Sequence, residues 1–173
     1  EKLKYLDKSK EDKADGKLRN YYKVQLLDGK EGWVQSDFVV LQATVATITH
    51  KSEIYSRPDL GTLTKKSFEP MDIIAVKSTQ GDWYEVVGKR RAGKWLDNGW
   101  IKNKGISSDE RDVAVAVYAT RALAKPTVAE VSSELLKIKE NADLSGSMFD
   151  THISELLLKL ENTASSEENT EAA

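Results

Sequence analysis

The stretch Gly81-Asp82-Trp83-Tyr84-Glu85-Val86-Val87 decides the fold, together with Gly99-Trp100-Ile101 further along the chain. Gly-Asp is typical of a tight turn, and the residues after it alternate as they do on a β-strand, where successive side chains point to opposite faces. Gly99-Trp100-Ile101 predicts a second strand that returns beside the first. We therefore expect a hairpin of two aromatic strands in the middle of the chain.

The same pattern occurs earlier in the chain, as an internal repeat. Tyr21–Leu26 predicts an alternating strand, Asp28-Gly29 predicts a turn, and Gly32-Trp33-Val34 predicts the returning strand. Trp33 takes the place that Trp100 has in the later copy. The repeat predicts two similar β units, and we expect both tryptophans to lie in their cores, because large aromatic side chains dominate small cores.

Around the first hairpin, Leu3–Leu6 predicts a short strand. The charged run Asp7–Asn20 predicts an exposed loop with a turn at Asp15-Gly16. Around the second hairpin we expect Leu63–Phe68 to be a polar segment and Gly88–Asn98 to be a long hairpin loop. Further extended segments of the second unit are expected at Val45–Thr49, Ile54–Pro58 and Met71–Val76.

The periodicity changes to that of helices from Ser107 on. Ser108 with the acids after it predicts a first helix start, although Val113–Val117 also alternates and leaves a strand as the alternative. Thr127 with Glu130 fits a capping box, and Ser147 with Asp150 predicts the start of the last helix. We expect two or three helices.

The composition excludes several kinds of chemistry. The chain has 173 residues, 39% apolar and 31% charged, with a net charge of −2, so it fits one or two soluble domains and does not favour a general polyanion binder or a nucleic-acid partner. It contains no cysteine, which excludes disulfides, thiolate metal sites and a cysteine nucleophile. No apolar run approaches the roughly 20 residues of a membrane-spanning helix.

We expect no metal, no cofactor and no catalytic residue. His50 and His152 are the only histidines, and neither has a second histidine at ligand spacing. There is no phosphate-binding loop and no dinucleotide-binding glycine fingerprint. A Ser-His-Asp triad and an unrecognised enzyme site stay open, although the Gly-x-Ser-x-Gly motif is absent from the sequence.

The Gly-Asp-Trp-Tyr turn and the closing Gly-Trp-Ile or Gly-Trp-Val resemble bacterial SH3 domains, which are small five-stranded barrels of cell-envelope and cell-wall proteins. Residues 43–106 cover the whole pattern, whereas residues 1–41 match only its latter half. The resemblance implies a β + α fold with two small SH3-like β-barrels, the first N-terminally incomplete. A helical segment at 107–163 and a disordered tail at 164–173 would follow them.

The resemblance also implies a ligand groove. In the family this groove is lined by aromatic residues, and the matching positions are Tyr55, Trp83 and the position after Gly-Trp-Ile. The first unit has Phe38 at this last position, whereas the second has Gly105. The alternative for Trp83 is a place in the barrel core.

A basic loop follows the central strand. Lys89, Arg90, Arg91 and Lys94 surround Trp95 near the tip of the predicted hairpin. Such a loop could bind a phosphate, an anionic glycan, an anionic lipid surface or nucleic acid through charge and stacking. The alternative is a solvated turn in which Trp95 folds back on the barrel.

The last helix offers a second kind of surface. Leu156, Leu157 and Leu160 could form a face for a partner helix or for a second copy of the chain. The alternative is that these leucines belong to the core of the helical segment.

We therefore predict a noncatalytic binding module of the bacterial cell envelope that recognises a cell-wall glycan or peptide, or an envelope protein. The alternative is a structural protein whose helices oligomerise or dock in an envelope complex. Because the chain begins at Glu1 and not at Met, we expect an upstream leader or membrane tether. The expected location is the periplasm or the cell surface, with lipid anchoring included and the cytoplasm as the alternative.

Overall fold

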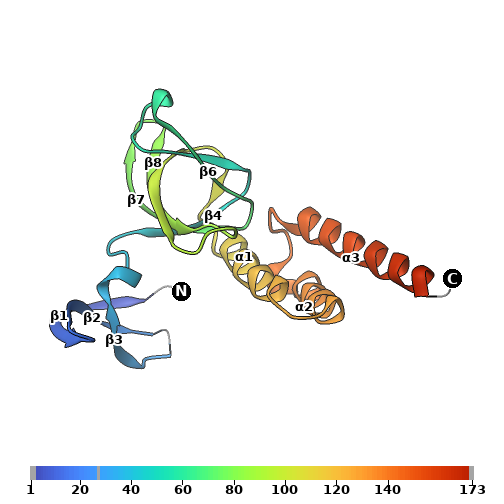
Figure 1. Cartoon of the computed structure of the whole chain (residues 1–173), viewed down its shortest axis with the longest axis horizontal. Coiled ribbons are helices and arrows are strands. Elements are labelled where there is room, and N and C mark those ends of the chain that lie inside the picture. The colour runs from blue at the N-terminus through green and yellow to red at the C-terminus, as the bar shows by residue number, and fades with distance from the viewer. Residues whose placement is uncertain (1–2, 27, 172–173) are drawn as a thin grey trace.

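The computed structural model describes the backbone of residues 3–26 and 28–171, and their side chains except those of 14 and 164–171. The chain has three parts: a small N-terminal sheet, a second sheet that curls into a partial barrel, and three C-terminal helices (Figure 1). The predicted mixed β and α class is confirmed at this level.

The N-terminal sheet is an antiparallel meander of β1 (Lys4–Ala14), β2 (Lys17–Gln25) and β3 (Glu31–Gln35), followed by the 3-10 turn η1 (Ser36–Phe38). The loop predicted over Asp7–Asn20 is wrong, because this segment is the long hairpin of β1 and β2. Asp15 and Gly16 have φ of 52° and 75°, which is the backbone of a two-residue hairpin turn. The strands therefore pair directly from Ala14 and Lys17 onward.

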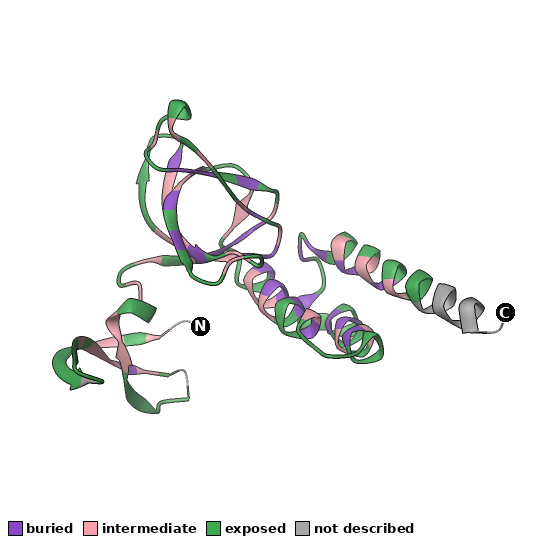
Figure 2. Cartoon of the chain, viewed as in Figure 1, coloured by how far each residue is buried: buried purple, intermediate pink, exposed green. Residues whose placement is uncertain are grey.

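This first sheet stays open and buries little. Of its described side chains up to Leu41, only Val24 is buried (Figure 2). Trp33, which was expected in a core, is 41% exposed, with the Lys10 ammonium 5.1 Å from the centroid of its ring. The expectation fails because no second layer covers that face of the sheet. Tyr5 and Tyr22 pack edge to face elsewhere on the sheet, with centroids 5.3 Å apart.

The second sheet holds seven antiparallel strands in the spatial order β10-β4-β7-β8-β9-β5-β6 and curls until its inner face is enclosed (Figure 1). A 3-10 turn, η2 (Leu60–Thr62), precedes β6. The strands are β4 (Thr44–Ile48), β5 (Ser52–Tyr55), β6 (Leu63–Phe68), β7 (Ile73–Gln80), β8 (Trp83–Lys89), β9 (Leu96–Lys102) and β10 (Ile106–Ser107).

The central hairpin is confirmed, since Glu85 of β8 pairs with Trp100 of β9. It is longer than predicted, because pairing continues to Lys89 and Leu96 and leaves only residues 90–95 as the loop. Strand β6 was missed because Lys65 and Lys66 hide its alternation, although it pairs with β5.

The barrel core is aliphatic with one phenylalanine. Trp100 is only partly buried, because it lies on the opposite face of β9 from buried Ile101, so it was not the core residue expected. Figure 2 shows buried positions alternating with less buried ones along the strands of the curled sheet. The core residues are Ala46, Ile48, Ile54, Phe68, Ile74, Val86 and Ile101.

The helical part consists of α1 (Glu110–Leu123), α2 (Val128–Glu140), the 3-10 turn η3 (Ala142–Leu144) and α3 (Asp150–Glu171). The strand alternative within α1 is therefore wrong. The N-cap half of the predicted capping box of α2 is confirmed: the Thr127 side chain accepts a hydrogen bond from the Glu130 backbone N–H at 3.2 Å. The Glu130 carboxylate accepts from the Thr127 hydroxyl at 2.8 Å, whereas in a full capping box it accepts from the N-cap backbone N–H. The disordered tail predicted at 164–173 stays a prediction, because the side chains of 164–171 and residues 172–173 lie outside the described residues.

The three helices share one core, which Met71 of the curled sheet joins. Within the described residues, no helix combines the length and the apolar character needed to cross a bilayer. The core residues from the helices and the turns between them are Val115, Ala116, Ala119, Ala122, Val131, Leu135, Ile138, Leu144, Phe149, Ile153 and Leu157.

A buried carboxylate holds the helices to the end of the sheet. Asp112 of α1 accepts hydrogen bonds from Ser107 Oγ at 2.6 Å, from Ser147 Oγ at 2.8 Å and from the Met148 backbone N–H at 2.9 Å. Burial acts to raise the pKa of Asp112, but these hydrogen bonds and the Arg111 charge outweigh it and lower the pKa below its usual value. The contacts join β10, α1 and the segment before α3.

Candidate functional site

A depression of about 610 Å³ lies where the chain enters β5 and where it leaves β9. Tyr55 reaches it because β5 pairs with β9 at Tyr55 and Trp100. The Thr49 backbone N–H donates to the Gly105 carbonyl at 2.8 Å and so ties the two walls together. We call this feature the Tyr55 depression; it is lined by His50, Lys51, Ser52, Glu53, Tyr55, Lys102, Lys104 and Gly105.

Trp83 supports the depression from inside the sheet. Its ring packs edge to face on Tyr55, with centroids 4.9 Å apart and an interplanar angle of 79°. The Lys102 ammonium lies 4.0 Å from the centroid of the Trp83 ring. Trp83 and Tyr55 are only 9% and 8% exposed. Their rings therefore support the wall of the depression and offer little surface to a ligand.

The third position that the resemblance assigned to the groove also reaches this site. Gly105 lines the depression with a φ of +84°, a backbone conformation that favours glycine. The Asn103 backbone N–H donates to the Asp82 carbonyl at 3.0 Å and fixes this segment beside the turn before Trp83. The structure thus brings Tyr55, Trp83 and Gly105 together.

The depression has a surplus of positive charge. Lys51, Lys102 and Lys104 line it, opposed by Glu53. Lys51 pairs with Glu69 at 3.8 Å, so the surplus comes from Lys102 and Lys104. The Tyr55 hydroxyl donates to Glu53 Oε2 at 3.4 Å, and burial, followed by the Glu53 charge, raises the pKa of Tyr55. The hydroxyl therefore stays protonated at neutral pH with its one hydrogen directed to Glu53, and the site offers lysine ammonium groups as donors to an anion.

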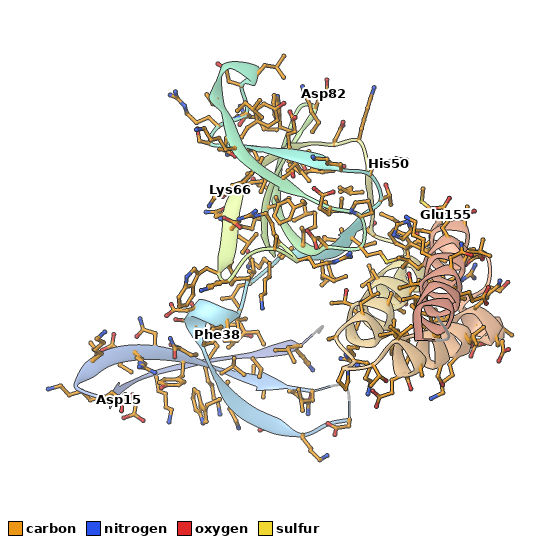
Figure 3. All side chains as sticks on the ribbon, turned by 45° about the vertical axis from the view of Figure 1, so that its right-hand side comes forward. Asp15, Phe38, His50, Lys66, Asp82 and Glu155 are labelled. Carbon is orange, nitrogen blue, oxygen red and sulfur yellow. The ribbon has the colours of Figure 1, made fainter. Side chains whose placement is uncertain are left out.

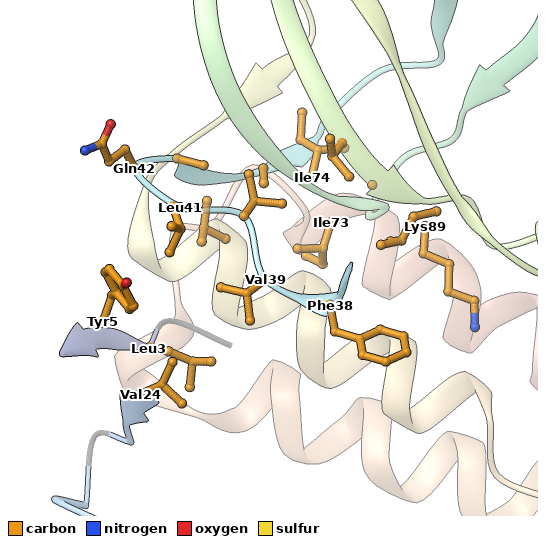
Figure 4. A pocket seen from close by; sticks show the side chains of 17 residues that line it. Leu3, Tyr5, Val24, Phe38, Val39, Leu41, Gln42, Ile73, Ile74 and Lys89 are labelled. Carbon is orange, nitrogen blue, oxygen red and sulfur yellow. The ribbon is translucent and has the colours of Figure 1, made fainter. Parts of the chain in front are cut away.

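Phe38, the matching residue of the first unit, lies elsewhere. It is 73% exposed on η1 and lines a separate groove of about 490 Å³ between the N-terminal sheet and the curled sheet. Figure 4 shows Phe38 and Lys89 on this groove together with Val24 and Ile73. Phe38 and His50 lie on different sides of the curled sheet in Figure 3. The Tyr55 depression and this groove share no lining residue.

The two arginines of the basic loop serve to hold its shape. Arg90 Nε donates to Asp97 Oδ2 at 2.6 Å, and Asp97 Oδ1 is 2.5 Å from Lys66 Nζ. An Arg91 guanidinium nitrogen donates to the Pro70 carbonyl at 3.1 Å.

The rest of the loop points to solvent. Lys89 and Lys94 are exposed, and Trp95 is 82% exposed, so the alternative in which Trp95 folds back on the barrel is wrong. A backbone that Arg90 and Arg91 hold in place thus presents Trp95 and two lysines to solvent.

We expect the anchoring carboxylate of this loop to make stability depend on pH. Burial opposes ionisation of Asp97 most strongly, but hydrogen bonds from Lys66 and Arg90 outweigh it and lower the pKa of Asp97. A lowered folded-state pKa contributes stability that is fully present above the unfolded-state pKa of about 3.9 and is lost as the pH falls through the folded-state pKa. Asp97→Asn should therefore be less stable than the parent at neutral pH and lose less on acidification.

Thermal unfolding midpoints of the parent and Asp97→Asn, measured from neutral to acidic pH, test this expectation. Asp59→Asn is a matched control, because Asp59 is an exposed acid that caps η2 in the same sheet. Two curves for the parent and Asp97→Asn that stay parallel over the whole range would contradict the argument.

The three leucines predicted as a partner face pack within this chain. Leu157 is buried in the helical core, and Leu156 and Leu160 are partly buried against it. Leu158, between them, is 58% exposed. The stripe therefore serves the helical core in this structure.

No family model matches the chain, and neither a curated protein nor a solved structure matches it. Within the described residues, no group of three or more histidine, aspartate or glutamate side chains is arranged to hold a metal ion.

Sequence reasoning missed the cations of the depression. Lys102 and Lys104 directly follow Gly99-Trp100-Ile101 and are spaced by two, which places them on one side of an extended segment. That spacing could have drawn attention to them. Lys51 carries no such signal, because hydrogen bonds from Thr49 and His50 to the distant Gly105 bring its segment to the site.

Proposed function

We propose that this chain is a noncatalytic binding module of the bacterial cell envelope and that the Tyr55 depression recognises a peptide bearing a carboxylate, such as a stem peptide of the cell wall. The observation that carries the proposal is the meeting of Tyr55 and Gly105 in one depression lined by lysines, with Trp83 packed edge to face on Tyr55 behind it. These positions come from distant parts of the sequence. Tyr55 and Trp83 correspond to aromatic groove positions of bacterial SH3 domains, whereas Gly105 departs from the family pattern, which has an aromatic residue there.

The shape of the curled sheet supports an SH3-like barrel for this unit. In this proposal the hairpin of β5 and β6 corresponds to the family's first loop, and Tyr55 is the last residue of β5 before the connecting loop. The central hairpin of β8 and β9 supplies Trp83 at its open end. The N-terminal sheet has the same kind of hairpin but no enclosed face, so we propose binding for the second unit alone.

The chemistry of the depression favours a carboxylate over other ligands. Ammonium groups of Lys102 and Lys104 can make charge-assisted hydrogen bonds to a carboxylate, whereas the Tyr55 hydroxyl donates its one hydrogen to Glu53. Glu53 in the same site repels a ligand that carries negative charge along its whole length. A peptide with one carboxylate beside neutral residues fits both features.

We expect the double variant Lys102→Gln, Lys104→Gln to bind such a peptide about 100-fold more weakly, because it loses two charge-assisted hydrogen bonds that contribute on the order of 1.5 kcal/mol each. Calorimetric titration measures this with a synthetic stem peptide that ends in a free carboxylate. The same peptide ending in an amide should also bind the parent more weakly.

Lys13→Gln with Lys65→Gln is the matched control, since both lysines are exposed and lie outside the depression. It should bind the carboxylate peptide as the parent does. Equal affinity of the parent for the acid and the amide, or an equal loss in the control, would overturn the proposal.

The alternative function, assembly through the helices, has less support. The leucines that it requires at a partner face are used in the core of the helical part.

A further inference from the structure

The two most exposed large apolar side chains among the described residues lie on neighbouring segments. Trp95 is 82% exposed at the tip of the hairpin of β8 and β9, and Phe38 is 73% exposed on η1. Leu96, next to Trp95, is 48% exposed and lines the same groove as Phe38 and Lys89. We call Phe38, Lys89, Lys94, Trp95 and Leu96 the Trp95 patch.

The charges around the patch are mainly positive. Lys89 and Lys94 are exposed, and Arg91 keeps its charge while it donates to the Pro70 carbonyl. Asp37 lies beside Phe38 and is outnumbered by these cations. Asp97 does not offset them, because it is already shared by Lys66 and Arg90.

A ligand for this patch must meet two requirements. It must shelter an indole, a phenyl ring and a leucine from water, since such exposed apolar groups mark interaction sites. It must also supply negative charge beside the apolar contacts. The surface of an anionic bilayer does both, because tryptophan favours the headgroup region and lysines beside it are attracted to acidic headgroups.

We propose that the Trp95 patch docks the protein on an anionic lipid bilayer, with Trp95 and Phe38 entering the headgroup region. The loop is suited to this role, because the Asp97 ion pairs and the Arg91–Pro70 hydrogen bond hold its backbone while Trp95 remains exposed. This surface lies apart from the Tyr55 depression and shares no residue with it. Each site can therefore be tested while the other is intact.

Co-sedimentation of the full chain with vesicles tests the proposal. We expect binding to vesicles of phosphatidylcholine mixed with phosphatidylglycerol, and much weaker binding to phosphatidylcholine alone. Lys89→Gln with Lys94→Gln should weaken partitioning about 30-fold, at roughly a factor of five for each lysine near an acidic surface. Phe38→Ala with Trp95→Ala should weaken it about tenfold or more.

Two controls distinguish docking through the Trp95 patch from nonspecific adsorption to the vesicles. Leu18→Ala with Leu60→Ala removes apolar side chains that are 66% and 65% exposed elsewhere, and it should bind vesicles as the parent does. Lys13→Gln with Lys65→Gln removes the same charge from other surfaces and should reduce binding much less than the change at Lys89 and Lys94 does.

Tryptophan fluorescence gives a second readout. The emission of the parent should shift to shorter wavelength on the mixed vesicles, because the indole of Trp95 leaves water, and Trp95→Phe should lose this shift. No vesicle binding, equal binding to neutral vesicles, or a shift that persists in Trp95→Phe would overturn the proposal. Capture by an acidic protein in place of vesicles would also overturn it. Titration of the same variants with the stem peptide tests the proposed function of the Tyr55 depression independently. Loss of vesicle binding with unchanged peptide binding would concern the Trp95 patch alone.

Discussion

Asp112→Ala is expected to lower the free energy of unfolding by about 3 kcal/mol. The change leaves Ser107 Oγ, Ser147 Oγ and the Met148 backbone N–H without their acceptor in a largely buried place, and leaving such a donor unpaired costs about 1–3 kcal/mol. The same change disconnects the helices from β10. Urea unfolding followed by circular dichroism measures the loss, which corresponds to a fall in melting temperature of about 6–12 °C for a chain of this size.

Asp109→Ala is the matched control for this prediction. Asp109 caps the same helix and accepts from the backbone N–H groups of Arg111 and Asp112, but it is exposed. Loss of such a cap costs about 1 kcal/mol. A similar loss in both variants would mean that Asp112 acts only as a helix-start acid and does not join the two parts of the molecule.

Gly99→Ala should destabilise the curled sheet by about 3 kcal/mol, near the upper end of the usual cost of overpacking. A Cβ at Gly99 would lie 2.5 Å from Ile54 Cγ2 and 2.8 Å from the Tyr55 carbonyl oxygen. The oxygen cannot move aside easily, because Tyr55 pairs with β9. Because Tyr55 lines the proposed binding site, the variant should also bind the stem peptide less well.

The internal repeat supplies the control for this second prediction. Gly32 is the counterpart of Gly99 in the earlier Gly-Trp pattern, and a Cβ there would meet no heavy atom within 4 Å. Gly32→Ala should change stability by less than about 0.5 kcal/mol. Chemical unfolding of the two variants side by side gives the comparison. Equal losses would show that the first sheet is packed as tightly as the second.

Local features of the sequence predicted much of this fold. The Gly81-Asp82 turn and the alternation after it depend only on neighbouring residues, so the hairpin of β8 and β9 could be recognised. The charged run of Asp7–Asn20 was misjudged because charge indicates exposure, and an exposed segment can still be a strand when both faces of its sheet meet solvent. The turn at Asp15-Gly16 was the better guide there.

Residues that depend on closure of the sheet were harder to predict. Tyr55 and Trp83 could be named through the resemblance, and the structure places their rings in contact. Nothing local indicated that Lys51 would join them, because its position depends on a contact between residues far apart in the sequence. The sequence could not show whether Leu156–Leu160 packs within the chain or against a partner, because an apolar helical stripe has the same sequence pattern in both cases.

The open N-terminal sheet divides the molecule into regions of unequal mutational tolerance. Because Val24 is its only described buried side chain, most substitutions along β1, β2 and β3 alter solvated groups and leave packing unchanged. The curled sheet has no such freedom at Gly88 or Gly99, where even one added methyl group would meet a backbone oxygen. Substitutions can therefore obscure the Gly-Trp pattern of β2 and β3 at little cost, whereas the pattern of β8 and β9 is held by its packing.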